Sequence, residues 1–175
     1  MTDIWVFAYG SLMWDPGFDF VEARPGLLRG YHRAFCIRSF NYRGTPSHPG
    51  LVLGLDRGGS CRGMVFRVAA AKAQAVMDYL YAREMTERVY HDRRVRVLTA
   101  GGPVTAHAFV VDRAHPQYAG RLEEETAARQ IAFSAGKRGP NRAYLENTVR
   151  HLEALGIADG PLHRLLERVE ELARG

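Results

Sequence analysis

A short segment near the N-terminus combines residue types that can bind an anion. Residues 7–14 read FAYGSLMW, so an apolar run leads directly into a turn formed by Tyr9, Gly10, Ser11 and Leu12. A glycine lets the backbone approach a ligand closely, and successive N–H groups in such a turn can bind a carboxylate or a phosphate. The segment lacks the spacing of a P-loop and of a dinucleotide-binding G-x-G-x-x-G motif. The alternative is an ordinary turn that ends a strand.

Glu84 is the second candidate for chemistry. Residues 77–90, MDYLYAREMTERVY, place it at the end of an apolar helix and just before a strand. If the preceding aromatic turn half-buries this carboxyl group, its pKa rises toward the value that a general base needs at neutral pH. The alternative is a surface glutamate paired with Arg83 or Arg88, and Glu87 is the local competitor for the acid/base role.

The residue pattern gives little support to metal or covalent chemistry. The seven histidines form no H-x-x-x-H or H-E-x-x-H arrangement, and neither Ser11 nor Ser39 lies in a G-x-S-x-G elbow. We therefore predict no metal site and no covalent catalysis. Cys36 and Cys61 could form one disulfide, but we expect them to be reduced, buried thiols.

The elements that must position these residues begin with strands. Apolar runs and alternating patterns predict strands at 4–8, 31–39, 51–55, 61–68, 94–100 and 104–112. Pro25, Gly26 and Gly30 indicate turns before the second strand, while DRGGS (56–60) and AGGP (100–103) indicate hairpin turns. Residues 69–82 are rich in helix formers and predict one helix, whose apolar face contains Ala73, Val76, Met77, Leu80 and Tyr81.

The second half of the chain changes to a helical pattern. Helices are predicted at 122–136, 140–156 and 159–175, from apolar periodicity, a proline at one start and glycines at the ends. Three glutamates at 123–125 fall in the first turn of their helix, where the helix dipole favours negative charge. Strands first and helices last predict an α+β fold, a compact and mostly antiparallel β-barrel or curled sheet with peripheral helices. We expect one domain over residues 1–175.

Composition and charge indicate which kinds of molecule the chain is expected to bind. The chain has a net charge of +5 and a balance of 46% hydrophobic and 25% charged residues, which is typical of a globular protein. The densest basic stretch, RVYHDRRVRV (88–97), alternates as a strand with one solvated face does, so we expect no nucleic-acid binding. A basic surface helps to attract an anionic small molecule. Without a secretory signal pattern or a long apolar run, we expect a cytoplasmic monomer with no membrane contact.

Four segments together resemble the ChaC family of glutathione-specific γ-glutamylcyclotransferases, and particularly its bacterial branch. They are FAYGSLMWDPGF (7–18), GYHRAFCIRSF with NYRGTPSHPG (30–50), YLYAREM (79–85) and GPNRAYLENTVRHLEALGI (139–157). A YGSL turn alone also occurs in other γ-glutamylcyclotransferase-like proteins. The REM glutamate, the RGTP loop and the N-x-x-Y-L helix narrow the resemblance to ChaC, and it covers essentially the whole chain.

The resemblance implies roles for individual residues. The YGSL turn, residues 9–12, would cradle the γ-glutamyl end of the substrate, and Glu84 would be the catalytic acid/base. The hydroxyl group of Tyr144 would contact the substrate, and Arg43 is a secondary candidate for its anionic end. The implied fold is a compact β-barrel surrounded by helices. Ala82 departs from the family, because a bulkier or charged residue often precedes the arginine.

The activity that the resemblance implies is the cyclisation of glutathione to 5-oxoproline and cysteinylglycine. This is a lyase reaction that needs no cofactor, because both reacting groups belong to one substrate. Two alternatives remain open. The same cyclisation could act on other γ-glutamyl amines or dipeptides, or the chain could be a non-catalytic regulatory module linked to cation transport, as the family's historical name suggests.

Overall fold

The computed structural model describes residues 2–85 and 88–175, and Glu87, the competitor of Glu84, lies outside the described residues. The chain divides into two compact units, residues 1–33 with 55–115 and residues 34–54 with 116–175. Two long strands, β2 (Glu22–Ser39) and β3 (Gly50–Val68), contribute residues to both units. A single domain over 1–175 stays a prediction.

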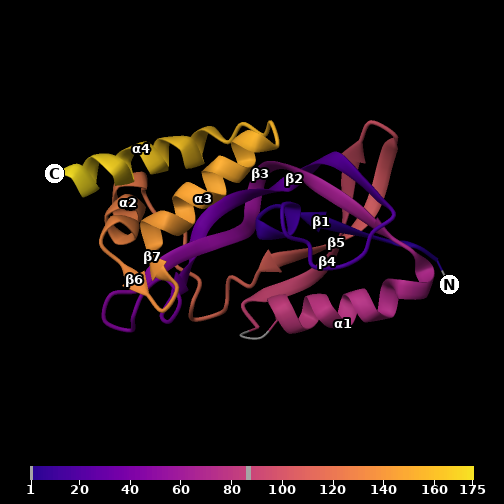
Figure 1. Ribbon diagram of the computed structural model, residues 1–175, viewed down its shortest axis with the longest axis horizontal. Helices are drawn as coiled ribbons and strands as arrows, with labels where there is room; N and C mark the ends of the chain where they lie inside the picture. The colour runs from indigo at the N-terminus through magenta and orange to yellow at the C-terminus, as the bar shows by residue number, and fades with distance from the viewer. Residues whose placement is uncertain (1, 86–87) are drawn as a thin grey trace. The chain divides into compact units, whose positions relative to one another are not determined.

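Five strands close into a barrel in the order β1-β3-β2-β4-β5 (Figure 1). β1 is Ile4–Ala8, β4 is Tyr90–Thr99 and β5 is Gly102–Val111. β1 pairs antiparallel with β3, β2 with β4 and β4 with β5, whereas β1 and β5 pair in parallel. The last three residues of β1 are completely buried, as the apolar run predicts. The predicted α+β fold with a mostly antiparallel barrel is confirmed.

The hairpin predicted around DRGGS is wrong. β3 continues from Gly50 to Val68 without a reversal. Gly58 and Gly59 have positive φ angles of 101° and 66°, which only glycine adopts easily, so they bend the strand as a bulge does. His32 of β2 places its Nδ1 atom 2.9 Å from the carbonyl oxygen of Gly58, which keeps the two neighbouring strands together at the bend.

The turn predicted from Pro25, Gly26 and Gly30 is also wrong, because β2 already begins at Glu22. A Cβ atom on Gly26 would lie 2.6 Å from a methyl group of Val97 on β4. The glycine therefore permits the close approach of β2 and β4 that closes the barrel. The hairpin predicted around AGGP is confirmed, since Thr99, the last residue of β4, pairs with Gly102, the first residue of β5.

A short 3-10 turn, η2 (Ala70–Lys72), leads into α1 (Ala73–Glu84). Val76 and Leu80 are the buried residues of α1, which makes its apolar stripe narrow. Tyr81, predicted on the apolar face, is 46% exposed. Its ring packs edge-on against Phe109 of β5 and its hydroxyl group donates to Asp92 of β4 at 2.6 Å. The tyrosine therefore lies at the edge of the packed face, where its ring is partly covered and its hydroxyl group is hydrogen-bonded.

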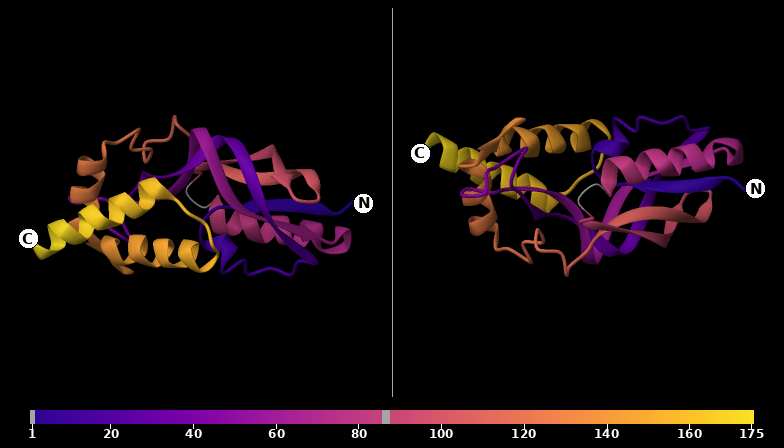
Figure 2. Two further views of the ribbon diagram at one scale, coloured as in Figure 1. Left: turned by 90° about the horizontal axis from the view of Figure 1, so that it is seen from above. Right: turned by 90° about the horizontal axis from the view of Figure 1, so that it is seen from below.

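The second unit contains α2 (Glu124–Ala132), α3 (Asn141–Ala154) and α4 (Gly160–Arg174) (Figure 2). The first of the three predicted helices is too long, because Ala135–Gly136 (β6) pairs with Gly139–Pro140 (β7). The apolar core of the three helices consists of Ala127, Ala128, Ile131, Leu145, Val149, Leu152, Leu162, Leu165 and Val169.

The glutamates at the start of α2 act mainly through ion pairs. The side chain of Glu123, the N-cap residue, makes no capping hydrogen bond. Glu125 instead accepts two hydrogen bonds from the guanidinium group of Arg168 in α4, at 2.7 and 3.0 Å. This bidentate geometry is the strong form of an arginine–carboxylate pair, and it links α2 to α4.

Two further expectations concern the chain as a whole. Cys36 and Cys61 are both buried thiols and are not joined in a disulfide, as predicted. Among the helices of the described residues, none has the length and apolar character that crossing a membrane requires.

Candidate active site

The YGSL turn follows β1 without a linker. Ser11–Met13 form a 3-10 turn, η1, in which the carbonyl oxygen of Gly10 accepts from the amide of Met13 at 2.8 Å. The amides of Ser11 and Leu12 are the first of this turn, so they have no acceptor within it. They also donate no hydrogen bond elsewhere in the part of the chain that the structure describes. The turn thus presents backbone donors in the way that an anion cradle requires.

A buried arginine is hydrogen-bonded to this turn. Arg33 of β2 is only 6% exposed, and its Nε atom donates to the carbonyl oxygen of Tyr9 at 2.7 Å. Its Nη2 atom donates to the carbonyl oxygen of Arg62 on β3. The sequence analysis missed this residue, although one signal was present: Arg33 occupies a buried position of a strand whose neighbours on that side, Phe35 and Ile37, are apolar.

Arg83 connects α1 to the YGSL turn. Its Nη2 atom donates to the hydroxyl oxygen of Ser11 at 2.9 Å, and its Nη1 atom donates to the carbonyl oxygen of Asp15 at 2.8 Å. The same Nη1 atom lies 2.9 Å from the hydroxyl oxygen of Tyr79, one helical turn earlier. The sequence analysis treated Arg83 only as an ion-pair partner of Glu84. A guanidinium group holds several acceptors in a fixed planar geometry, which the single ammonium group of a lysine does not provide.

Glu84 is the last residue of α1. Its side chain is 18% exposed, and the nearest atoms of Arg83 and Glu84, Nε and Oε1, are 3.6 Å apart. Burial raises the pKa of Glu84 above its ordinary value, and the nearby positive charge of Arg83 lowers it by less. The expected ion pair with Arg83 is therefore present, but it belongs to a largely buried carboxyl group. A raised pKa in this setting suits a general acid/base.

Tyr144 and Arg43 lie together in the second unit. The hydroxyl oxygen of Tyr144 accepts from the amide of Leu53 at 3.2 Å, and its ring packs edge-on against Phe35. The guanidinium group of Arg43 lies over the same ring, 5.4 Å from its centre, and donates to the carbonyl oxygen of Arg138 at 2.9 Å. Both side chains have structural partners. Their contacts with a substrate stay predictions.

Asn141 explains why the N-x-x-Y-L helix begins where it does. This residue is completely buried. Its Oδ1 atom accepts from the amide of Leu51 and its Nδ2 atom donates to the carbonyl oxygen of Leu51, both at 2.8 Å. The side chain thus pairs with β3 as a neighbouring strand would, and it fixes the start of α3 one turn before Tyr144. Sequence reasoning used the asparagine as part of a motif and assigned it no role.

The predicted site residues fall into two groups. The first unit holds Glu84 and the whole YGSL turn, and Arg83 joins the helix end to Ser11. The second unit holds Arg43 and Tyr144. Within residues 2–85 and 88–175, no group of three or more histidine, cysteine, aspartate or glutamate side chains could hold a metal ion.

Comparison with solved structures identifies the fold class. The chain resembles the crystal structure of a γ-glutamylcyclotransferase specific to glutathione from yeast, with a TM-score of 0.85 at 23% identity. The match covers 98% of this chain and 97% of that chain. The barrel with its long shared strands and following helices is therefore the γ-glutamylcyclotransferase-like fold.

Sequence relatives identify the family within this fold. The family model for ChaC-like protein matches residues 4–172, and the chain belongs to the ChaC family. It is 36% identical to the glutathione-specific γ-glutamylcyclotransferase of Escherichia coli (strain K12), over 97% of this chain and 74% of the relative. It is 32% identical to the enzyme of the same description from Schizosaccharomyces pombe, over 91% of this chain and 88% of the relative.

Proposed function

We propose that this chain is a glutathione-specific γ-glutamylcyclotransferase with Glu84 as its general acid/base. The observation that carries the proposal is the placement of a largely buried carboxyl group with a raised pKa beside Arg83, which reaches the YGSL turn. The relatives that carry this activity in their names support glutathione as the substrate.

The first task of the site is to fold a flexible substrate. The α-amine of the γ-glutamyl unit attacks the γ-carbonyl carbon, a five-membered lactam forms, and the amide bond to the cysteine nitrogen breaks. The α-carboxylate of the γ-glutamyl unit suits the amides of Ser11 and Leu12, which have no acceptor in the described part of the chain. Holding amine and carbonyl in reacting geometry can lower the barrier by several kcal/mol.

The second task is proton transfer. The attacking amine must lose a proton, and the departing nitrogen of cysteine must receive one. Glu84 takes the first proton as a carboxylate and delivers a proton to the leaving nitrogen as a carboxylic acid. Such catalysis contributes roughly 10²–10⁴-fold to a rate. Backbone amides of the turn or the Tyr144 hydroxyl group supply the neutral donors that a tetrahedral oxyanion needs.

Arg83 acts as a positioning residue in this proposal. It holds Ser11 and the carbonyl oxygen of Asp15 on one side and Glu84 on the other. The acid/base and the substrate cradle are thereby fixed relative to each other. An error of about 1 Å in such a placement can cost on the order of 100-fold in rate.

The direct test incubates the purified protein with glutathione and measures 5-oxoproline and cysteinylglycine. We expect both products in equal amounts, and a loss of roughly 100-fold or more in kcat for Glu84→Gln. Glu167→Gln removes an exposed glutamate of α4 and should leave the rate unchanged. If Glu84→Gln formed 5-oxoproline at the wild-type rate, Glu84 would not be the acid/base of the reaction.

The same assay separates the alternatives. A cyclotransferase of broader range would turn over γ-glutamyl dipeptides as fast as glutathione. A regulatory module would bind glutathione in a calorimeter without releasing 5-oxoproline. We further propose that the protein is a cytoplasmic monomer. Sedimentation of the purified chain as a dimer would contradict the proposal that it is a monomer.

A further inference from the structure

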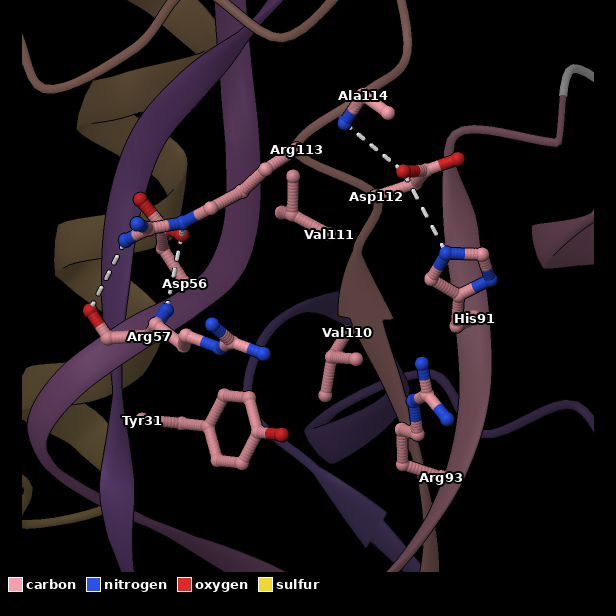
Figure 3. Close-up of a pocket in the computed structure, with 10 residues that line it drawn as sticks. All are labelled: Tyr31, Asp56, Arg57, His91, Arg93, Val110, Val111, Asp112, Arg113 and Ala114. Atoms are coloured by element: carbon pink, nitrogen blue, oxygen red, sulfur yellow. Dashed lines mark hydrogen bonds and ion pairs between the residues drawn. The ribbon is translucent and has the colours of Figure 1, made fainter.

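A cavity of about 210 Å³ opens on the first unit, and none of the residues that line it is among the predicted catalytic or substrate-binding residues (Figure 3). Four neighbouring barrel strands and the segment after β5 form its walls. The lining residues are Tyr31, Asp56, Arg57, His91, Arg93, Val110, Val111, Asp112, Arg113 and Ala114.

The carboxylates of this cavity already have partners. Asp56 is 4% exposed and accepts from the Nε atom of Arg113 at 2.8 Å and from the amide of Arg57 at 2.9 Å. Asp112 accepts from the amide of Ala114 at 2.9 Å and lies 3.4 Å from the Nε2 atom of His91. Neither carboxylate neutralises the two remaining arginines by a direct ion pair.

Three donor groups line the cavity around Val110. Figure 3 shows the guanidinium group of Arg57 (β3) and the hydroxyl group of Tyr31 (β2) on one side of Val110, and the guanidinium group of Arg93 (β4) on the other side. None of the three groups has a hydrogen-bond or ion-pair partner within the residues that the structure describes. An anion bound between the guanidinium groups of Arg57 and Arg93 would be attracted by both charges.

We infer that this cavity binds a phosphate group, either as inorganic phosphate or as a small phosphomonoester. Donors reach the space from three walls, which suits a tetrahedral oxyanion with acceptor oxygens on all sides. A carboxylate presents its two oxygens in one plane and satisfies a single guanidinium fork. The apolar side chains of Val110 and Val111 leave a place for the carbon part of a phosphomonoester. The positive net charge of the chain favours the approach of such a ligand.

The test titrates the purified protein with sodium phosphate at constant ionic strength and follows backbone amide resonances by NMR. Saturable shifts at Val110, Val111 and Ala114 are expected. Arg93→Gln should weaken binding about tenfold or more, because a charge-assisted hydrogen bond is lost. Arg96→Gln removes the same charge from an exposed position of the same strand outside the cavity and should change the affinity less than about twofold.

Further variants and ligands in the same titration identify the ligand and test the arginine of the other strand. Arg57→Gln on β3 should weaken binding like Arg93→Gln, with Arg62→Gln as its exposed control on the same strand. Glycerol 3-phosphate that binds more tightly than phosphate would identify a phosphomonoester site, and equal affinity would identify a site for the phosphate group alone. Acetate should bind at least about tenfold more weakly than phosphate.

Three outcomes overturn the inference. They are a linear, non-saturating response to phosphate, an equal loss of affinity in Arg93→Gln and Arg96→Gln, and an acetate affinity that matches that of phosphate. Because the measurement needs neither glutathione nor turnover, its result is independent of the proposed enzymatic activity. The amide spectrum of each variant also reports whether the variant is folded.

Discussion

The guanidinium group of Arg83 donates to the hydroxyl oxygen of Ser11 at 2.9 Å. The same side chain places its Nε atom 3.6 Å from the carboxyl group of Glu84. One arginine thus contacts both the turn that presents backbone donors and the carboxyl group proposed as acid/base. This arrangement makes Arg83 the residue whose replacement best separates geometry from charge.

Arg83→Lys keeps the positive charge but loses the planar fork that holds Ser11 and the carbonyl oxygen of Asp15. We expect kcat/KM for glutathione to fall roughly 10–100-fold, since the turn and Glu84 would no longer be fixed relative to each other. Steady-state kinetics with glutathione measure the effect. Arg129→Lys, at an exposed arginine of α2, serves as the control. A wild-type kcat/KM for Arg83→Lys would show that the fork has no positioning role.

The acid side of the pH profile should report Glu84. Burial raises the pKa of Glu84, so the carboxylate that acts as base forms at a higher pH than for an ordinary glutamate. Arg83 lowers that pKa, and Arg83→Gln should therefore move the acid limb of kcat/KM to still higher pH, whereas Arg83→Lys should leave it in place. A limb that moves to lower pH in Arg83→Gln would contradict this assignment.

The same titration should appear in the free energy of unfolding. The folded state holds the proton of Glu84 more tightly than the unfolded chain does, because the folded-state pKa is the higher one. The stability that this group contributes is present below its ordinary pKa and is lost as the pH rises through the folded-state pKa. Chemical denaturation of wild type and Glu84→Gln over this pH range measures the difference. A difference that does not change with pH would argue against a raised pKa.

Tyr144→Phe should affect both stability and catalysis. The amide of Leu53 would lose its bond to the tyrosine oxygen, which lowers the free energy of unfolding by about 1–3 kcal/mol. With the fold intact, we expect weaker glutathione binding or a slower chemical step. Tyr42→Phe, at a tyrosine that is 46% exposed, is the matched control. Unchanged kinetics in Tyr144→Phe would remove this residue from the site and leave it a structural role.

Asn141→Leu should be among the more destabilising single changes in the second unit. Both polar groups of the Leu51 backbone would lose their partner in a fully buried position. The expected cost is about 2–5 kcal/mol, measured by chemical denaturation. Asn147→Leu replaces an exposed asparagine of the same helix and should cost less than about 0.5 kcal/mol. Equal stability of the two variants would show that the Leu51 contacts contribute nothing.

Local patterns in the sequence were sufficient for much of the fold. The apolar run before the YGSL turn predicts a buried strand, and the last three residues of this strand are completely buried in the barrel. The alternation on both sides of AGGP predicts the β4–β5 hairpin, and the 3.6-residue periodicity of the last third predicts its helices. These elements depend on residues close together in the chain. The placement of Glu84 at a helix end and the implied ChaC family follow from motifs of the same local kind.

Contacts between distant residues decided the rest. Gly58 and Gly59 carry the same local signal whether they form a turn or a bulge, and only the neighbouring strand determines which one occurs. The proposed role of Glu84 requires that its carboxyl group be buried, and the sequence does not show whether it is. Packing around the end of α1 buries it. The contacts of Arg83 with Ser11, and of Asn141 with Leu51, join residues 72 and 90 positions apart. No local pattern contains such a contact, because the fold itself brings its partners together.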